Sequence, residues 1–268
     1  MGRHQKRIAA PRSWRIERKT AYWTVKPRPG PHPGERSLPL LLIVRDILKL
    51  ADSSREARRV LNEGNVVVNG KERRDHKFPV GIFDILSVPA VKADYLVLLD
   101  KKGRLRLVET EATEEREASK KLCRVNGKRV LREGRTQLNL HDGRNILLGE
   151  EAVEGEGTKI KTHDSLLISV PENQILQHFA YKEGSKVMVV GGKHSAQTGE
   201  IAEIRKVRSP EPNVVKIKLL NDRGNGGGKK EGGESFEFET IEDYVFVVGE
   251  EKVEVAAVEV AAGAAGVK

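Results

Sequence analysis

Residues 53–71 decide the local fold of this chain, and they read SSREARRVLNEGNVVVNGK. Ser53 is a preferred helix N-cap, and Glu56 three residues later completes a capping box. Gly64 is placed to end that helix, because glycine adopts the left-handed conformation of a helix end without steric cost. A short apolar strand then leads into Asn69-Gly70, a pair typical of a two-residue hairpin turn. The segment therefore predicts a helix, a strand and a tight turn in succession.

The predicted helix has one basic face and one apolar face. At 100° per residue its arginines and Asn62 fall within an arc of roughly 100°, opposite Ala57, Val60 and Leu61. We expect the apolar face to pack, which leaves guanidinium groups free to pair with phosphate oxygens through their planar forks. The residues expected to contact RNA in this segment and directly after it are Arg55, Arg58, Arg59, Asn62, Asn69, Lys71, Arg73 and Arg74.

Residues 1–36 form a basic, proline-rich arm before this segment. The four prolines in residues 26–34 lack the amide donor that a helix or a central strand needs. The arm has little apolar area to bury and is expected to order only against a partner, a solvated tail being the alternative. Its aromatic residues, Trp14 and the pair Tyr22-Trp23, interleave with basic ones, which suits base stacking and phosphate pairing. The expected RNA contacts here are Arg3, Lys6, Arg7, Arg12, Trp14, Arg15, Arg18 and Lys19.

Positive charge is concentrated in the first quarter of the chain. Residues 1–74 contain 18 Lys or Arg and 7 Asp or Glu, a net charge of +11, whereas residues 75–268 contain 30 and 32. The whole chain carries a net charge of +9. This balance favours a polyanionic partner, either nucleic acid or an acidic membrane surface. An RNA-binding face is therefore expected in the first quarter.

Cysteine usage and hydropathy indicate a cytoplasmic protein. Cys123 is the single cysteine, which excludes an internal disulfide and a zinc site built on cysteines. The longest apolar run, residues 38–44, is interrupted by Pro39 and is far shorter than the roughly 20 residues that span a bilayer. The basic N-terminus is not followed by an apolar stretch of signal-peptide type. We expect no membrane partner and no small-molecule substrate.

The remaining elements predict an α+β fold of several modules. A helix with a broad apolar face is expected over 38–51. The region after residue 89 is expected to be all-β with one helix from Thr113 to Ser119, and Asn126-Gly127 repeats the hairpin-turn signal. The strands expected there are 95–99, 104–109, 121–125, 137–140, 166–170 and 175–180.

A small β-barrel is expected next, with strands over 186–190, from residue 200, and over 214–220, 235–240 and 244–248. Lys193, in its glycine-rich loop, is a further expected RNA contact. Residues 224–233 are predicted to be a flexible, low-complexity hairpin tip. The module boundaries are a basic arm over 1–36, a helix-turn RNA-binding module over 37–89, a central β region over 90–180, the barrel over 181–249 and a flexible tail over 250–268.

Three segments carry a resemblance to one family. Residues 53–71 resemble an RNA-binding module found in ribosomal proteins, pseudouridine synthases and tyrosyl-tRNA synthetases, through Ala57-Arg58-Arg59, Gly64 and the residues 66–71. Residues 184–201 resemble the KOW motif of ribosomal proteins and elongation factors. The start of the chain, from Lys6 to Trp14, is similar to that of the archaeal and eukaryotic ribosomal protein family S4e. In that family the N-terminal region is followed by the RNA-binding module, a central β region and a KOW barrel, which is the order predicted here. The resemblance implies a structural protein of the small ribosomal subunit, of the archaeal branch, that binds ribosomal RNA beside neighbouring ribosomal proteins.

Catalytic and metal sites were weighed and set aside. The pairs His141-Asp142 and His163-Asp164 suggest a metal-dependent phosphohydrolase, but they lie in turn contexts without further ligands, so neither a metal nor a cofactor is expected. Cys123 is expected to be a core residue. Two alternatives stay open from the residues alone. One is an RNA-modifying enzyme with an appended RNA-binding module, and the other is a KOW-bearing transcription or translation factor.

Overall fold

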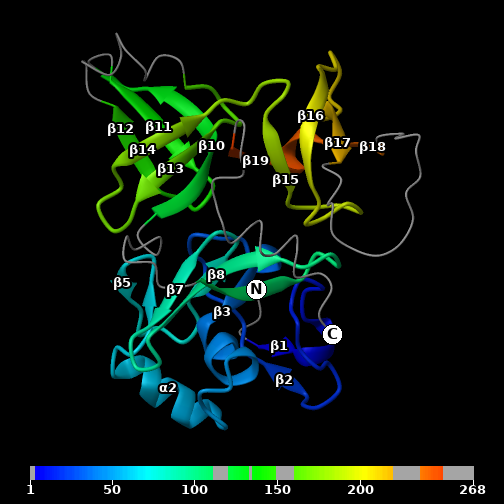
Figure 1. Ribbon diagram of the computed structural model, residues 1–268. Helices are drawn as coiled ribbons and strands as arrows, with labels where there is room; N and C mark the ends of the chain where they lie inside the picture. Colours follow the sequence, from blue (N-terminus) through cyan, green and yellow to red (C-terminus); the bar gives the residue numbers. More distant parts are fainter. Residues whose placement is uncertain (1–3, 111–119, 133–134, 149–159, 220–235, 250–268) are drawn as a thin grey trace.

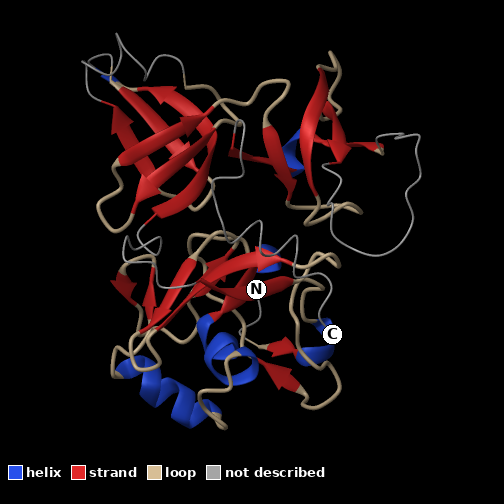
Figure 2. Cartoon of the chain, in the orientation of Figure 1, coloured by secondary structure: helices blue, strands red, loops and turns tan. Residues whose placement is uncertain are grey.

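The computed structural model describes residues 4–110, 120–132, 135–148, 160–219 and 236–249. This part of the chain is mostly β-strand with a few short helices (Figure 2). Three five-stranded antiparallel sheets carry the fold. In Figure 1 the first, with the helices, occupies the lower half, and the other two lie above it side by side. No described helix is long and apolar enough to cross a bilayer.

The segment from Ser53 onward folds as its sequence predicts. Helix α2 runs from Ser54 to Asn62, and the Ser53 hydroxyl accepts a hydrogen bond from the Glu56 amide at 3.2 Å. The Glu56 carboxylate accepts from the Asp52 amide at 3.1 Å, one residue before the amide that a capping box would use. At the other end Gly64 has φ +81°, and the amides of Gly64 and Asn65 donate to the carbonyls of Leu61 and Val60. This pair of bonds is a Schellman motif.

The hairpin turn opens the first sheet. Asn69 and Gly70 have φ of 51° and 71°, as a type I′ turn requires, and they join β4 (Val67–Val68) to β5 (Lys71–Glu72). The other strands of this sheet are β7 (Ile85–Val88), β8 (Ala93–Leu99) and β9 (Leu105–Thr110), in the order β5-β4-β7-β8-β9. The sheet thus continues past residue 89, so the boundary expected there falls inside one sheet.

The helix expected over 38–51 is shorter and irregular. Its first residues form β3 (Ser37–Pro39), which pairs with β6 (Pro79–Gly81), because Pro39 has an extended backbone and cannot donate within a helix. Helix α1 (Leu40–Leu42) follows and continues as a π-helical turn, η3 (Ile43–Ile47). Every residue from Leu38 to Val44 is buried, so the run is a core element as its apolar face predicts.

The arm is packed against the first sheet, so the expectation that it buries little was wrong. Its elements are β1 (Gln5–Lys6), η1 (Arg7–Ala9), β2 (Trp23–Thr24) and η2 (Gly34–Arg36), and β1 pairs with β2. Trp14 is only 2% exposed and donates from its indole nitrogen to the Ser37 carbonyl at 2.7 Å. The Arg18 guanidinium donates to the carbonyls of Ile8, Ala10 and Pro11. The buried Trp14 indole therefore holds the arm to Ser37, and the Arg18 guanidinium holds the arm's own backbone together. The amino-acid composition of the arm did not reveal either contact.

The central sheet has the order β12-β11-β10-β13-β14. Its strands are β10 (Lys120–Val130), β11 (Thr136–Leu140), β12 (Asn145–Leu148), β13 (Ser165–Ser169) and β14 (Ile175–Phe179). Four of these were predicted and β12 was missed, as was β7 in the first sheet. The hairpin turn expected at Asn126-Gly127 was wrong. β10 runs through it with a bulge, because its first half pairs with β13 and its second half with β11. The helix expected over 113–119 lies outside the described residues.

The last sheet has the order β18-β17-β16-β15-β19. Its strands are β15 (Lys186–Val189), β16 (Thr198–Arg205), β17 (Val214–Leu219), β18 (Glu237–Ile241) and, after the turn η7 (Glu242–Tyr244), β19 (Val245–Gly249). Its core is continuous with the others: Phe246 packs on Phe83, in the turn before β7, at 4.6 Å between ring centroids, and Phe179 of the central sheet joins the same cluster. The glycine-rich insertion and the tail lie outside the described residues.

Candidate nucleic-acid interface

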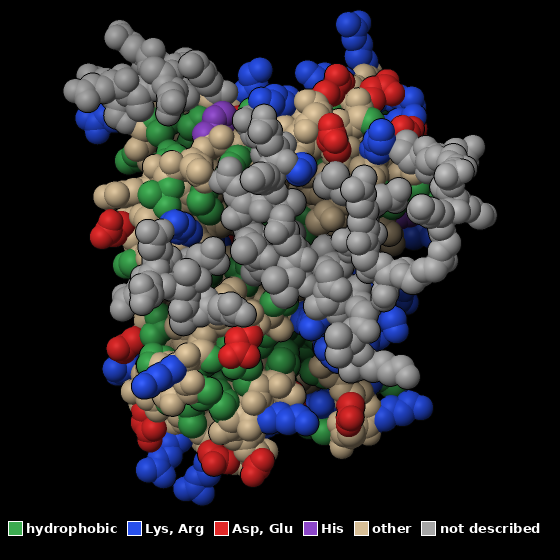
Figure 3. All heavy atoms as spheres, viewed as in Figure 1, with side chains coloured by type: hydrophobic (Ala, Val, Ile, Leu, Met, Phe, Trp, Pro, Cys, Tyr) green, Lys and Arg blue, Asp and Glu red, His purple; other side chains and the backbone are tan. Residues whose placement is uncertain are grey.

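Helix α2 presents the basic face that its sequence predicts. Arg55, Arg58, Arg59 and Asn62 are all exposed, while Ala57 and Leu61 are fully buried behind them. Of the arginines, Arg59 holds Glu63 one turn later at 3.1 Å. In Figure 3, Lys and Arg side chains project from the lower rim of the molecule, where Figure 1 places α2 and β2, with acidic side chains between them.

The turn after α2 contributes fewer free cations than expected. Lys71 and Arg74 are exposed, and Arg74 lies 3.6 Å from Glu72. The Arg73 guanidinium covers the ring of Phe78 at 4.5 Å, so it is half-buried. The turn therefore extends the positive surface mainly through Lys71 and Arg74.

Asn69 is removed from the expected RNA contacts because its side chain points inward. It is 7% exposed, its amide nitrogen donates to Asp84 at 2.9 Å, and its oxygen accepts from the Ile85 amide at 3.0 Å. Pro171 lies against the turn as well, since a Cβ added to Gly70 would sit 3.1 Å from its Cδ. The side chain that sequence reasoning assigned to RNA instead fixes the turn to the sheet.

The expected residues of the arm separate into two groups. Lys6, Arg12, Arg15 and Lys19 are exposed. The others are engaged within the protein: Arg7 is 6% exposed and donates to the Glu17 carbonyl, and Arg18 and Trp14 make the bonds described above. Trp14 in particular cannot stack on a base. Arg3 lies outside the described residues, and Lys193 is exposed in the loop between β15 and β16.

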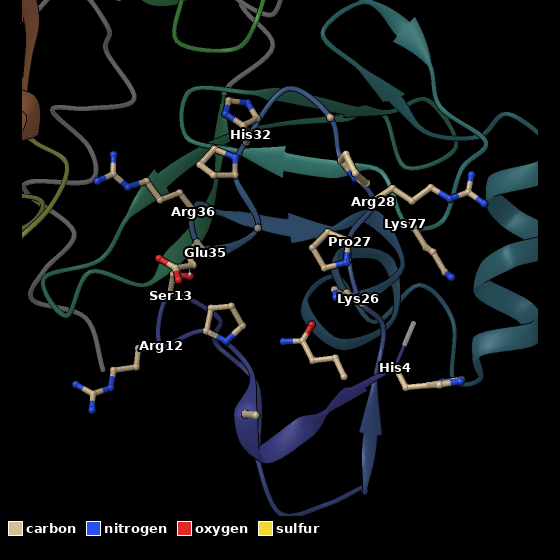
Figure 4. Close-up of a pocket in the computed structure, with 17 residues that line it drawn as sticks. His4, Arg12, Ser13, Lys26, Pro27, Arg28, His32, Glu35, Arg36 and Lys77 are labelled. Carbon is tan, nitrogen blue, oxygen red and sulfur yellow. Dashed lines mark hydrogen bonds between the residues drawn. The ribbon is translucent and has the colours of Figure 1, made fainter. Parts of the chain in front are cut away.

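A basic groove lies between the two limbs of the arm, and sequence reasoning missed it. It has a volume of about 1320 Å³. Its lining consists of some of the residues in 4–13 and 26–36, together with Lys77. Figure 4 shows Arg12, Arg28, Arg36 and Lys77 projecting from its rim, with Lys26 and Pro27 between them. The Arg28 guanidinium pairs with Asp75 at 2.9 Å. The groove arises only when the arm folds back on itself, so no local pattern predicts it.

His76 is influenced by cations of both the groove and α2. Burial lowers the pKa of His76, and the nearby Arg58 guanidinium lowers it further, with Lys77 and Arg28 acting in the same direction against Asp75. Arg28 of the arm, Arg58 of α2 and Lys77 of the loop before β6 therefore all act on one imidazole.

A buried charge network lies next to the basic groove, because His32 lines the groove and also contacts this network. The Lys121 ammonium donates to Asp84 and to Asp142, both at 2.7 Å, and none of the three side chains is more than 2% exposed. Asp84 also accepts from the Gly81 amide at 2.8 Å and lies 3.0 Å from His32 of the arm. Burial would raise the pKa of Asp84, but Lys121 and His32 hold it well below its ordinary value. The network ties the arm, the first sheet and the central sheet together.

Within the described residues, one cluster offers potential metal ligands, namely Cys123, His141 and Asp142. Burial raises the pKa of the Cys123 thiol and, with Lys121, lowers that of His141 to about 3. The Lys121 ammonium already binds the Asp142 carboxylate, and the His141 Nδ1 accepts from the Arg124 amide at 3.2 Å. A neutral thiol and a carboxylate that already holds a cation are poor ligands, so the residues do not fit a metal. Cys123 is a core residue, as predicted.

Comparisons with known proteins agree with the order of these parts. Three family models match the chain: the RS4NT domain over residues 1–35, the S4 domain over 40–86 and ribosomal family S4e over 91–175. The small ribosomal subunit protein eS4 of Methanocella arvoryzae is 44% identical over 93% of this chain and 95% of its own, and that of Archaeoglobus fulgidus is 42% identical over 92% and 93%. The crystal structure of the 30S ribosomal protein S4e from Thermoplasma acidophilum superposes with a TM-score of 0.61 at 33% identity, covering 80% of this chain and 96% of that one.

Proposed function

The chain belongs to ribosomal family S4e, and on that basis we propose that it is a structural constituent of the small ribosomal subunit that binds ribosomal RNA. Its neighbours would be other small-subunit proteins, in the cytoplasm of an archaeal cell. The family consists of structural components of the ribosome, so the alternative of an RNA-modifying enzyme is not retained. The observation that carries RNA binding is the row of exposed arginines on α2, whose opposite face is locked into the core.

The α2 face would grip the backbone of a folded RNA. Arg55, Arg58 and Arg59 stand on one helix, so their backbone positions are fixed before the RNA arrives, and each guanidinium group can bind two phosphate oxygens. An A-form duplex hides its base edges in a deep, narrow groove, so this surface reads shape more than sequence. Lys71 and Arg74 would add contacts to the same backbone.

We extend the proposal to the two flanking parts of the chain. The exposed basic residues of the arm would hold phosphates beside the α2 contact. The unit over 181–249 would be a KOW-type small barrel, which is supported by its five short antiparallel strands and by the loop that holds Lys193. In that unit the His194 and Phe238 rings stack with their centroids 4.2 Å apart, and the His194 Nδ1 lies 3.0 Å from the Gln197 Oε1. Its neighbour Lys193 is exposed and would face a partner.

Binding to small-subunit ribosomal RNA tests the α2 face directly. We expect the double variant Arg58→Ala and Arg59→Ala to weaken binding and to lower the slope of log affinity against log salt by about 1.4 to 1.8, since each neutralised phosphate contributes roughly 0.7 to 0.9. The matched control, Lys206→Ala with Arg208→Ala, removes the same charge from exposed residues that follow β16. Equal losses in the two variants, or an affinity that does not respond to salt, would show that α2 is not the RNA-binding face.

A further inference from the structure

Two large aromatic side chains of the arm are exposed although a third is buried. Tyr22 is 64% exposed and Trp23 55%, whereas Trp14 is 2% exposed. Tyr22 and Trp23 meet edge to face with ring centroids 4.7 Å apart, and the His4 ring lies 5.6 Å from that of Trp23. We call these three rings the aromatic patch. Its apolar area is left open to solvent, which marks a surface used for binding.

The aromatic patch is held by a small but well-connected piece of backbone. Lys6 pairs with Trp23 in the β1–β2 ladder, and the Arg7 amide donates to the Tyr22 carbonyl at 2.9 Å. The Lys6 ammonium lies 5.6 Å from the centre of the Tyr22 ring. Because the backbone positions of both rings are set by this pairing, little conformational entropy is lost when a flat ligand stacks on them.

The aromatic patch borders the basic groove. His4 contacts Trp23 and also lines the groove, so the two surfaces are continuous. The groove is lined by five basic side chains, Arg12, Lys26, Arg28, Arg36 and Lys77, and among its lining residues the one acidic side chain is Glu35. Flat apolar rings at one end and a surplus of positive charge along the other side match the bases and the phosphates of one nucleic-acid strand.

We propose that the aromatic patch and the basic groove bind an unpaired strand of RNA, with a base stacked on Trp23 or Tyr22 and its phosphates in the groove. Inside a duplex both faces of each base are covered by its neighbours, so an unpaired base offers these rings a face that an internal paired base does not. This inference rests on the proposed RNA-binding function and adds a second binding mode to it. In the first mode α2 binds the phosphate backbone of folded RNA, and in the second the arm binds an unpaired strand that extends from that RNA.

Tryptophan fluorescence separates the arm from the rest of the protein. The chain has two tryptophans, and Trp14 is buried, so emission that responds to stacking comes from Trp23. We would titrate the full-length protein with a ten-nucleotide oligouridylate and with an RNA duplex of the same length. We expect the oligouridylate to quench the emission and the duplex to leave it nearly unchanged. Trp23→Phe should abolish the quenching while it keeps the Trp14 emission of the folded protein.

Affinity gives the second readout. Stacking contributes roughly 1 to 3 kcal/mol per base, so Tyr22→Ser with Trp23→Ser should weaken oligouridylate binding about tenfold or more. Both side chains are exposed, so the variant should keep the thermal unfolding curve of the wild type. Unchanged oligouridylate affinity in this variant would overturn the inference, as would equal quenching by the duplex, and either would point to a protein neighbour on the aromatic patch.

The two proposals fail in distinguishable ways. The same preparations are measured against small-subunit ribosomal RNA, with the Arg58→Ala and Arg59→Ala variant alongside. If that variant loses ribosomal RNA binding while the Tyr22 and Trp23 variant binds both RNAs as the wild type does, only the inference about the aromatic patch is overturned. If the wild-type protein binds no ribosomal RNA, the proposed function fails and the inference fails with it.

Discussion

At the scale of single residues, the buried Lys121 joins two parts of the chain that the sequence alone does not connect. Its ammonium sits between two buried carboxylates, and the burial that would lower its pKa is outweighed by Asp84 and Asp142, which raise it. The three charges are stable only as a set, because an unpaired ion in the interior costs several kcal/mol.

Removing Lys121 should therefore be strongly destabilising. We expect Lys121→Ala to lower the free energy of unfolding by about 3 to 5 kcal/mol, since Asp84 and Asp142 lose the ammonium that lies 2.7 Å from each and keep only His32 and Arg144, at 3.0 and 3.2 Å. Urea unfolding measures this, with Lys120→Ala as the control, because Lys120 is the exposed neighbour on the same strand. Equal unfolding midpoints for the two variants would contradict the role given to the network.

Residue roles in the site were predictable only where local geometry decides them. The exposure of Arg55, Arg58 and Arg59 follows from helical periodicity against an apolar face. The roles of Trp14 and Asn69 were mistaken because their partners, Ser37 and Asp84, lie 23 and 15 residues away in the sequence. Residue type alone does not separate an indole that stacks on RNA from one that anchors the arm.

At the scale of elements, α2 is the part that its own sequence determines most completely, from the Ser53 cap to the Gly64 end. The strand β10 shows the opposite case. Asn126-Gly127 is a strong local turn signal, yet the backbone stays extended there because β13 and β11 pair with its two halves. Local propensity determines an element whose hydrogen bonds are internal, as in α2. It is overridden where the hydrogen bonds come from distant strands, as in β10.

The end of α2 gives a prediction at this scale. Gly64 has φ +81°, and a Cβ there would also approach the Glu72 carboxylate to 3.1 Å. We expect Gly64→Ala to destabilise the protein by about 1 kcal/mol, because a left-handed backbone is costly for residues with a side chain. Gly34→Ala is the control, since the nearest atom to its Cβ would be Pro27 Cγ at 3.7 Å, an ordinary contact. Thermal unfolding of both variants decides, and a Gly64 variant as stable as the Gly34 one would refute the account of this helix end.

At the scale of the whole molecule, the order of the parts was predictable and their packing was not. The arm, helix α2, the central strands and the last sheet follow one another as the sequence indicates. The contacts between them come from residues far apart: the Arg124 guanidinium donates to the carbonyls of Asp243 and Val245, and Lys121 joins Asp84 to Asp142. The parts therefore present the α2 face and the basic groove on one connected body.

The proposed function requires this protein to reside stably on the small ribosomal subunit through ribosomal RNA. Sucrose-gradient sedimentation of cell extract after a high-salt wash tests it most directly. We predict stoichiometric cofractionation of the wild-type protein with small subunits, and a shift of the Arg58→Ala and Arg59→Ala variant toward the top of the gradient. Wild-type protein found free at the top, with washed small subunits lacking it, would contradict the account.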